Sequence, residues 1–283
     1  MTDVEVGAGV EVKRGPPVSS EPSAARVPWT ERAIGVWTIR AITALVVFGA
    51  WELYGRASNR ALFAPPSRVV SAFKEIAIDD SILWHAIADS LAALAIGFSA
   101  AIVVGTFVGL LMGRIRTVEY LLDPYVSFLY ALPTIVIVPL LIIWLGIGAE
   151  TRVAIVFTTS IVPVLLNTMA GAKRVKEEYL DVGKNYGANG RQMMRTVVLP
   201  SVLPYVFTGI NVAIGSAIIG MVLGELLIVI RGIGGLVVTY SNSFQPDKVF
   251  VALGVLVAMS VVLTSLLRRA RMRLMPWTRK FER

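Results

Sequence analysis

The segment VKEEYLDVGKNYGANGRQMMRTVVLP, residues 175–200, is a polar island in a chain built mostly of long apolar runs. Its residues Val175, Tyr179, Val182 and Tyr186 recur at spacings of four, three and four, so they share one face of a helix. The opposite face carries the charged residues Lys176, Glu177, Asp181 and Lys184. We therefore predict a short amphipathic helix between two membrane spans.

Glycine and asparagine interrupt this helix at Gly187, Asn189 and Gly190. Gly187 is expected to let the chain reverse, in a backbone conformation that a residue with a Cβ atom adopts poorly. Leu199-Pro200 opens the next apolar run, since proline is tolerated in the first turn of a helix. The segment is predicted to be a helix–turn–helix elbow, although periodicity alone fits an ordinary solvated loop helix equally well.

The composition places this elbow in an integral membrane protein. Of 283 residues, 55% are hydrophobic and only 16% are charged, against about a quarter charged in soluble domains. The mean hydropathy is +0.71. The net charge of +8 comes from basic residues beside the apolar runs, which is typical of membrane flanks rather than of a surface that binds nucleic acid. The predicted fold class is all-α and polytopic, surrounded by membrane lipid and with no nucleic-acid partner.

Six apolar runs are long enough to cross a bilayer, and the elbow is expected to connect the fourth and fifth. Their approximate bounds are 34–54, 86–112, 121–145, 153–170, 199–230 and 249–267. Residues 1–32, rich in Pro, Ser and Gly without periodicity, are expected to form a disordered tail, and residues 33–283 a transmembrane domain. A short interfacial helix is expected at 67–73.

Basic residues orient the chain. They cluster after the second span, in the elbow and after the sixth span, all on one side of a six-span count. By the positive-inside rule that side is cytoplasmic, so both termini and the elbow are expected there. The loop between the first two spans is also basic, so this orientation depends on the later loops.

Two spans carry patterns that predict packing. The third contains three prolines, which remove backbone donors and are expected to kink or unwind it, either as a gate or for plain packing. They are Pro124, Pro133 and Pro139. The second span has a small residue at every fourth position, a stripe that lets another helix approach closely. Its members are Ala93, Gly97, Ala101, Gly105, Gly109 and Gly113.

Glu225 is an acid late in the fifth apolar run, and nothing in the sequence identifies an intramembrane partner for it. It is either a functional residue inside the membrane or an interfacial residue beyond the end of the span. The glycine-rich turn at 231–235 lacks the preceding strand and following lysine of a phosphate-binding loop. This turn is therefore expected to be a flexible loop at the membrane surface.

The motifs that the chain lacks limit its chemistry. No G-x-x-x-x-G-K-[ST] motif occurs, so the chain is expected not to hydrolyse ATP itself. With one histidine and no cysteine, a zinc site or a histidine-based triad is close to excluded. We expect no catalytic, cofactor-binding or metal-binding residue, and predict that the chain is not an enzyme.

The elbow resembles a known loop. Asp181-Val182-Gly183, Gly187 and Val197-x-Leu199-Pro200 stand at the spacing of the EAA loop in permease subunits of binding-protein-dependent ABC importers. Asp181, Gly183 and Val197 depart from the usual residues of that loop. The run LFAPPSRVVSAF, residues 62–73, is similar to a segment between the first two spans in permeases of the sulfonate, taurine and nitrate type. As a whole the chain looks closest to permeases of the nitrate, sulfonate, taurine and bicarbonate type.

This resemblance implies a permease subunit in a bacterial plasma membrane, which forms the solute pathway of an ATP-driven importer by alternating access. The implied partners are two ATP-binding cassette ATPase subunits, which hold the ATP, a second copy of this chain and an extracytoplasmic solute-binding protein. The implied solute is a small anion such as a sulfonate, a nitrate-like ion or an organic acid. The implied ATPase-coupling residues are Tyr179, Asp181, Val182, Gly183, Lys184, Tyr186 and Gly187.

Polar residues within the fourth and fifth spans are the candidates for the pathway. They are Asn167, Thr208, Asn211, Ser216 and Glu225. All but Glu225 are uncharged, which suits a transient path that should not hold its solute tightly. An ion-coupled secondary transporter is the alternative function, but it calls for acids or broken helices in two related halves, and no such internal repeat is evident.

Overall fold

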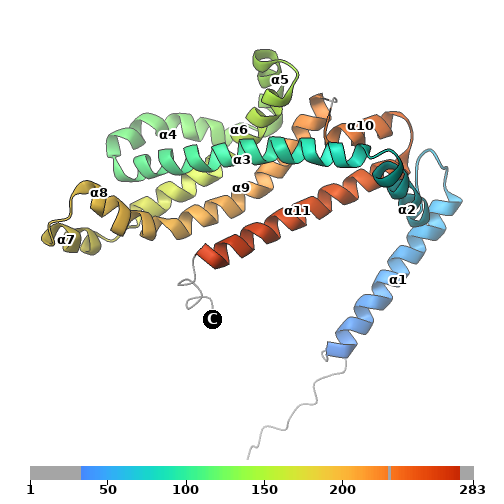
Figure 1. Ribbon diagram of the computed structural model, residues 1–283, viewed down its shortest axis with the longest axis horizontal. Coiled ribbons are helices and arrows are strands. Elements are labelled where there is room, and N and C mark those ends of the chain that lie inside the picture. Colours follow the sequence, from blue (N-terminus) through green and yellow to red (C-terminus); the bar gives the residue numbers. More distant parts are fainter. Residues whose placement is uncertain (1–32, 229–230, 275–283) are drawn as a thin grey trace, which may run out of the picture. The chain divides into compact units, whose positions relative to one another are not determined.

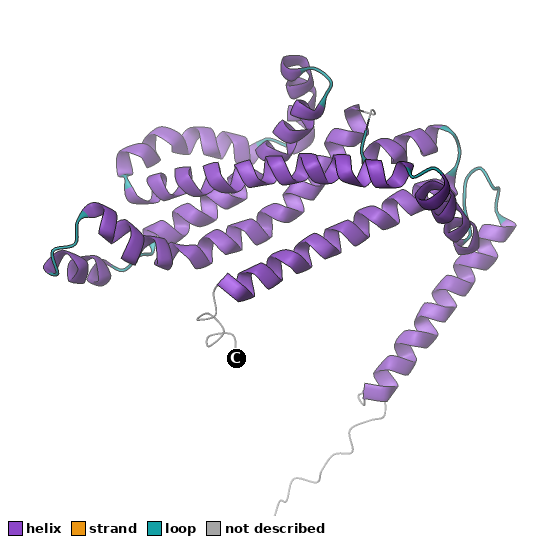
Figure 2. Cartoon of the chain, in the orientation of Figure 1, coloured by secondary structure: helices purple, strands orange, loops and turns teal. Residues whose placement is uncertain are grey.

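A computed structural model describes residues 33–228 and 231–274, and within these ranges every regular element is a helix (Figures 1 and 2). Five helices are long and apolar enough to cross a membrane, or six if one bent pair counts as a span. The predicted all-α polytopic fold is confirmed. Residues 1–32, predicted to be a tail, and the last part of the basic C-terminal cluster lie outside the described residues.

The helices follow the predicted spans closely, with the elbow between α6 and α9. Their bounds are α1 Ala33–Ala57, α2 Pro66–Lys74, α3 Ile82–Arg114, α4 Arg116–Ala131, α5 Thr134–Leu145, α6 Ala149–Lys173, α7 Glu177–Asn185, α8 Gly190–Met193, α9 Leu199–Ile228, α10 Ile233–Asn242 and α11 Pro246–Leu274. Two π-helical segments, η2 Glu75–Asp79 and η3 Met194–Val198, extend α2 and precede α9.

The chain divides into two compact units, residues 1–50 and 51–283. In the first unit the structure describes the beginning of α1, where Trp37, Leu45 and Phe48 are exposed. Exposed apolar side chains on a helix of this length suit contact with lipid. The second unit contains the remaining helices and is the part that positions the candidate sites.

Helices α3, α6 and α9 pack side by side at the centre of the second unit (Figure 1). The small-residue stripe of α3 faces α6. A Cβ atom on Gly97 would lie 2.6 Å from the Val153 carbonyl oxygen, and one on Gly109 would lie 2.5 Å from that of Leu165. Because only hydrogen occupies these positions, the two backbones approach closely, and the packing predicted for the stripe is confirmed.

The third predicted span is a broken helix. Helices α4 and α5 meet at an angle of 104° around Pro133, while Pro124 and Pro139 lie inside helices. The predicted break is therefore confirmed at Pro133, where a proline precedes the first residue of α5 and its missing N–H costs no helical bond. Every residue of α4 is at least partly exposed, so this part of the unit is loosely packed.

Two boundaries differ from the predictions. The helical path into the fifth span begins at Gly190, not near Leu199, and passes through the wide turn η3 just before Pro200, which cannot donate a regular helical bond. The prediction of a flexible surface loop at 231–235 is wrong, because Gly234 and Gly235 are buried in the first turn of α10. Gly232 has φ +90°, which makes the turn into α10 possible.

Candidate functional site

The elbow helix α7 ends in a glycine cap. The Gly187 N–H donates to the Lys184 carbonyl at 2.8 Å, and the Ala188 N–H donates to the Gly183 carbonyl at 3.0 Å. This is the Schellman pattern, which requires a left-handed residue after the helix. Gly187 supplies it with φ +74°, as the sequence predicts.

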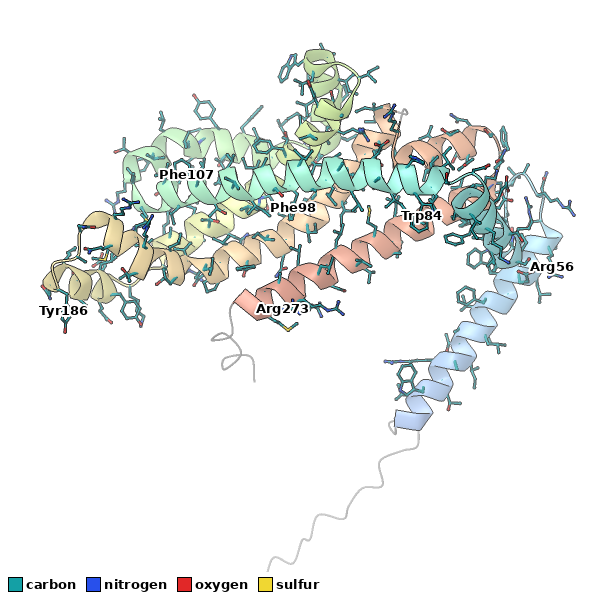
Figure 3. The ribbon with its side chains drawn as sticks, viewed as in Figure 1. Arg56, Trp84, Phe98, Phe107, Tyr186 and Arg273 are labelled. Carbon is teal, nitrogen blue, oxygen red and sulfur yellow. The ribbon has the colours of Figure 1, made fainter. Side chains whose placement is uncertain are left out.

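The apolar face of α7 is open. Tyr179, Val182 and Tyr186 are 52%, 54% and 88% exposed, and Figure 3 shows the Tyr186 side chain at the tip of the elbow. Val175, predicted to share this face, is instead buried and precedes the first residue of α7. It packs in the core at the end of α6, so the outward apolar face is narrower than predicted.

Helix α7 contacts its immediate neighbours in the chain, α8 and η3. The Met193 side chain lies against Gly183, where an added Cβ atom would be 2.5 Å from the methionine methyl carbon. Asn189 and Gln192 exchange side-chain and backbone hydrogen bonds of 2.9 Å each, a capping box that begins α8. The elbow thus has a defined shape although its outer surface is uncovered.

A hollow of 390 Å³ lies beside α7, between this helix and the beginning of α9. Tyr179 and Val182 line one side, and Val197, Pro200 and Ser201 line the other. Apolar walls with an occasional hydroxyl are typical of grooves that receive a partner's side chain.

The elbow is joined to the spans at the last turn of α6. Gly171 packs against the Tyr205 ring of α9, and the Arg174 guanidinium lies 5.8 Å from the same ring. Lys173 forms an ion pair with Glu119 of α4 at 2.5 Å. These contacts join the end of α6, next to the elbow in the chain, to α9 and α4.

Four of the pathway candidates lie along α6 and α9. Asn167 packs on Gly209, and its amide donates to a carbonyl of its own helix at 2.8 Å. The exposed Thr208 hydroxyl does the same at 3.0 Å. Asn211 and Ser216 are half-buried and make no hydrogen bond to any described residue, so their polar groups are available.

Glu225 lies apart from these four and is fully buried. Its carboxylate accepts hydrogen bonds from the Ser90 hydroxyl at 2.6 Å and the Gly234 N–H at 2.9 Å, and an Arg152 nitrogen is 3.9 Å away. Ser90 also accepts from the Ile233 N–H at 3.0 Å. These contacts, here called the polar knot, place a negative charge at the first turn of α10, where the helix dipole favours it.

Sequence reasoning missed the partners of Glu225 because they come from distant segments. One signal was present: Ser90 precedes Ala93 by three residues, which places it on the small-residue face of α3. Arg152 stands in the first turn of α6, at the end of the bundle where α9 ends. An acid inside an apolar helix demands such partners.

The family match and the most similar known proteins agree with one another. The family described as "Binding-protein-dependent transport system inner membrane component" matches residues 101–275, more than half of the chain. The taurine transport system permease protein TauC of Escherichia coli is 30% identical over 75% of this chain and 79% of its own length. The bicarbonate transport system permease protein CmpB of Synechococcus elongatus is 31% identical over 61% of each chain.

A solved structure shares the arrangement of helices. The crystal structure of an amino acid ABC transporter with histidines matches with a TM-score of 0.56 and 14% identity. The match covers 71% of this chain and 98% of the other. At this identity the likeness concerns the fold alone.

Proposed function

This chain belongs to the family of binding-protein-dependent transport system inner membrane components, and we propose that its elbow is the coupling helix of the transporter. The chain is the permease subunit of an ATP-driven ABC importer, a multi-pass protein of the plasma membrane and not an enzyme. It works with ATPase and solute-binding-protein partners. The ATP belongs to the ATPase subunits.

The observation that carries the coupling proposal is the exposed apolar face of α7 on a locally fixed scaffold. Tyr179, Val182 and Tyr186 are too exposed to stabilise this chain, but they can anchor a partner. Asp181 and Lys184 form an exposed pair at 3.0 Å and can reach charges at the rim of the partner's groove. Gly183 and Gly187 set the shape, the first by receiving Met193 and the second by its positive φ.

We propose that the open side of α9 lines the solute pathway. Asn167, Thr208, Asn211 and Ser216 supply polar groups along α6 and α9, and a second copy of the chain would face them across the path. Alternating access then follows when the elbow moves and the ends of α6 and α9 move with it. We do not place Glu225 on this pathway. Its carboxylate is buried in the polar knot and lines no described pocket.

The proposed solute is a small anion. The support comes from the names of two relatives: one is a permease for taurine, a zwitterion with an anionic sulfonate group, and the other is a permease for bicarbonate. Uptake assays with the assembled transporter and its binding protein would compare a sulfonate, bicarbonate and a neutral solute. Transport of a neutral or cationic solute alone would remove the anion proposal and leave the permease function intact.

The energy source tests the proposal directly. The complex of this chain with its ATPase subunits is reconstituted in vesicles with the binding protein outside, and uptake is measured with ATP or with an imposed proton or sodium gradient. We expect uptake with ATP alone. Uptake driven by an ion gradient in the absence of the ATPase would favour a secondary transporter.

We also propose that both termini and the elbow are cytoplasmic. Since the chain has no native cysteine, single cysteines at Ala57, Ala149, Gly190 and Asn242 report sidedness through a membrane-impermeant thiol reagent. Labelling from outside is expected at all positions except Gly190. Labelling of Gly190 from outside, or protection of Asn242, would reject this orientation.

A further inference from the structure

The Arg152 side chain is buried and makes no hydrogen bond to any described residue. The residue is 7% exposed, and one guanidinium nitrogen is fully enclosed and has no hydrogen-bond partner among the described residues. The Glu225 carboxylate lies 3.9 Å from this nitrogen, beyond hydrogen-bonding distance. A guanidinium carries five N–H donors, and buried donors in native proteins are nearly always satisfied.

Both carboxylate oxygens of Glu225 accept hydrogen bonds from groups other than Arg152. One of its oxygens accepts from the Ser90 hydroxyl at 2.6 Å and the other from the Gly234 N–H at 2.9 Å. The carboxylate therefore offsets the charge of Arg152 but leaves its donors free. Glu225 therefore binds the first turn of α10 through its hydrogen bonds, and the Arg152 guanidinium remains available to another acceptor.

Arg152 lines a pocket of 220 Å³ at the end of the bundle opposite the elbow. Ile147, Gly148, Ala149, Ile228 and Arg231 line it with Arg152. The pocket lies at the first turn of α6, whose N-cap Gly148 offers no side-chain acceptor to the free N–H groups. Its volume equals about seven waters at roughly 30 Å³ each, enough for a small polyatomic ion.

The charges around the pocket favour an anion. Two arginines line it, and no acidic residue does. Glu150, in the same first turn, is exposed, and Asp89 lines a separate cavity that Arg231 also lines. The helix dipole of the 25-residue α6 adds positive potential at the same place.

We propose that this pocket binds a small oxyanion, held by Arg152 from inside and Arg231 at the mouth. Two oxygens of a sulfonate, sulfate, bicarbonate or phosphate can accept parallel N–H···O hydrogen bonds from one guanidinium, which would satisfy two of the Arg152 donors that the described residues leave free. The oxyanion can come from the transported solute or from a phospholipid headgroup. Binding does not depend on coupling at the elbow; only its assignment to the solute rests on the proposed function.

The test measures binding of radiolabelled sulfate to the complex with its ATPase subunits in phosphatidylcholine nanodiscs. Arg231→Gln removes a charge at an exposed position, and the double variant Arg152→Gln/Glu225→Gln removes the buried pair without leaving an unpaired charge. Arg60→Gln, at an exposed loop position away from the pocket, is the matched control. ATPase association is measured on the same samples and should be unchanged in all variants.

We expect saturable binding, weakened at least tenfold in the double variant and several-fold by Arg231→Gln, with Arg60→Gln unchanged. Competition by methanesulfonate in either lipid assigns the site to a solute, whereas loss of sulfate binding on replacing the lipid with phosphatidylglycerol assigns it to a headgroup. Non-saturable binding, or equal binding by wild type, Arg231→Gln and the double variant, would overturn the site. Failure of the wild-type chain to associate with the ATPase subunits, with sulfate binding intact, would instead count against the proposed coupling function.

Discussion

Glycine serves opposite purposes at the α3–α6 seam and at the elbow. At Gly109 an added Cβ atom would lie 2.5 Å from the Leu165 carbonyl oxygen, whereas at Gly187 nothing lies within 4 Å of it. Gly187 is required instead by its backbone, with φ +74°. The seam uses glycine to bring two helices of this chain together, and the elbow uses it to hold an outward shape.

The contrast separates residues that fold the chain from residues that present a surface. Along the seam, and at Ser90 and Glu225 of the polar knot, side chains are buried and find partners within the chain. On α7, Tyr179, Val182 and Tyr186 are exposed and contribute little to stability. Substitutions should therefore affect folding most at the seam, less at the knot and least at the elbow.

The largest effect on folding is expected from Gly109→Leu. A leucine there would force α3 and α6 apart, at a cost of about 1–3 kcal/mol or more, and should reduce the yield of monodisperse protein in size-exclusion chromatography. Gly254→Leu is the control, since a Cβ atom at that exposed position of α11 meets nothing within 4 Å. Normal insertion, assembly and transport by Gly109→Leu and Gly105→Leu would show that the stripe faces lipid.

An intermediate effect is expected from Ser90→Ala. This change removes the 2.6 Å bond to Glu225 and the 3.0 Å bond from the Ile233 N–H, and should lower the free energy of unfolding by about 1–3 kcal/mol. Thermal unfolding of the purified protein measures it. Ser243→Ala, whose exposed hydroxyl bonds only within its own helix region, should change little. Equal stability of both variants would mean that the knot does not hold α10.

The smallest effect is expected from Asn189→Ala. Loss of this N-cap should destabilise α8 by about 1 kcal/mol and leave the spans intact. Hydrogen exchange of the amides at 190–193 should become faster by several-fold, while the unfolding midpoint stays within error. Asn185→Ala, which loses no capping bond, is the control. A large drop in global stability would contradict the separation between the elbow and the folded core.

Much of this fold could be predicted from local pattern. The lengths of the apolar runs predicted the spans. The spacing of small residues every four positions predicted the close packing of α3, and Gly187 predicted the end of α7. The three prolines predicted that the third span would be kinked or broken. Which of them breaks it depends on packing, since Pro124 and Pro139 lie inside helices.

The polar knot could not be predicted, because it depends on tertiary contacts. Ser90 is 135 residues from Glu225 along the chain. The other donor to Glu225 belongs to α10, whose glycine-rich beginning led us to predict a loop there. Val175 shows the same limit within the elbow. Its spacing fits the outward face, yet its position next to the end of α6 buries it.

We propose that the elbow couples this chain to its ATPase subunits. The direct measurement is ATPase association, together with binding-protein-stimulated ATP hydrolysis, for Gly187→Val and for the double variant Tyr179→Ala/Tyr186→Ala. Gly146→Val is the matched control, because Gly146 has φ +76° and equally open surroundings but lies at the opposite end of α6. We expect both elbow variants to insert normally and to bind the ATPase at least tenfold more weakly, with stimulated hydrolysis lost and the control unchanged in association. Full association and full stimulated hydrolysis in both elbow variants would rule out coupling through the elbow and show that it is a solvated loop.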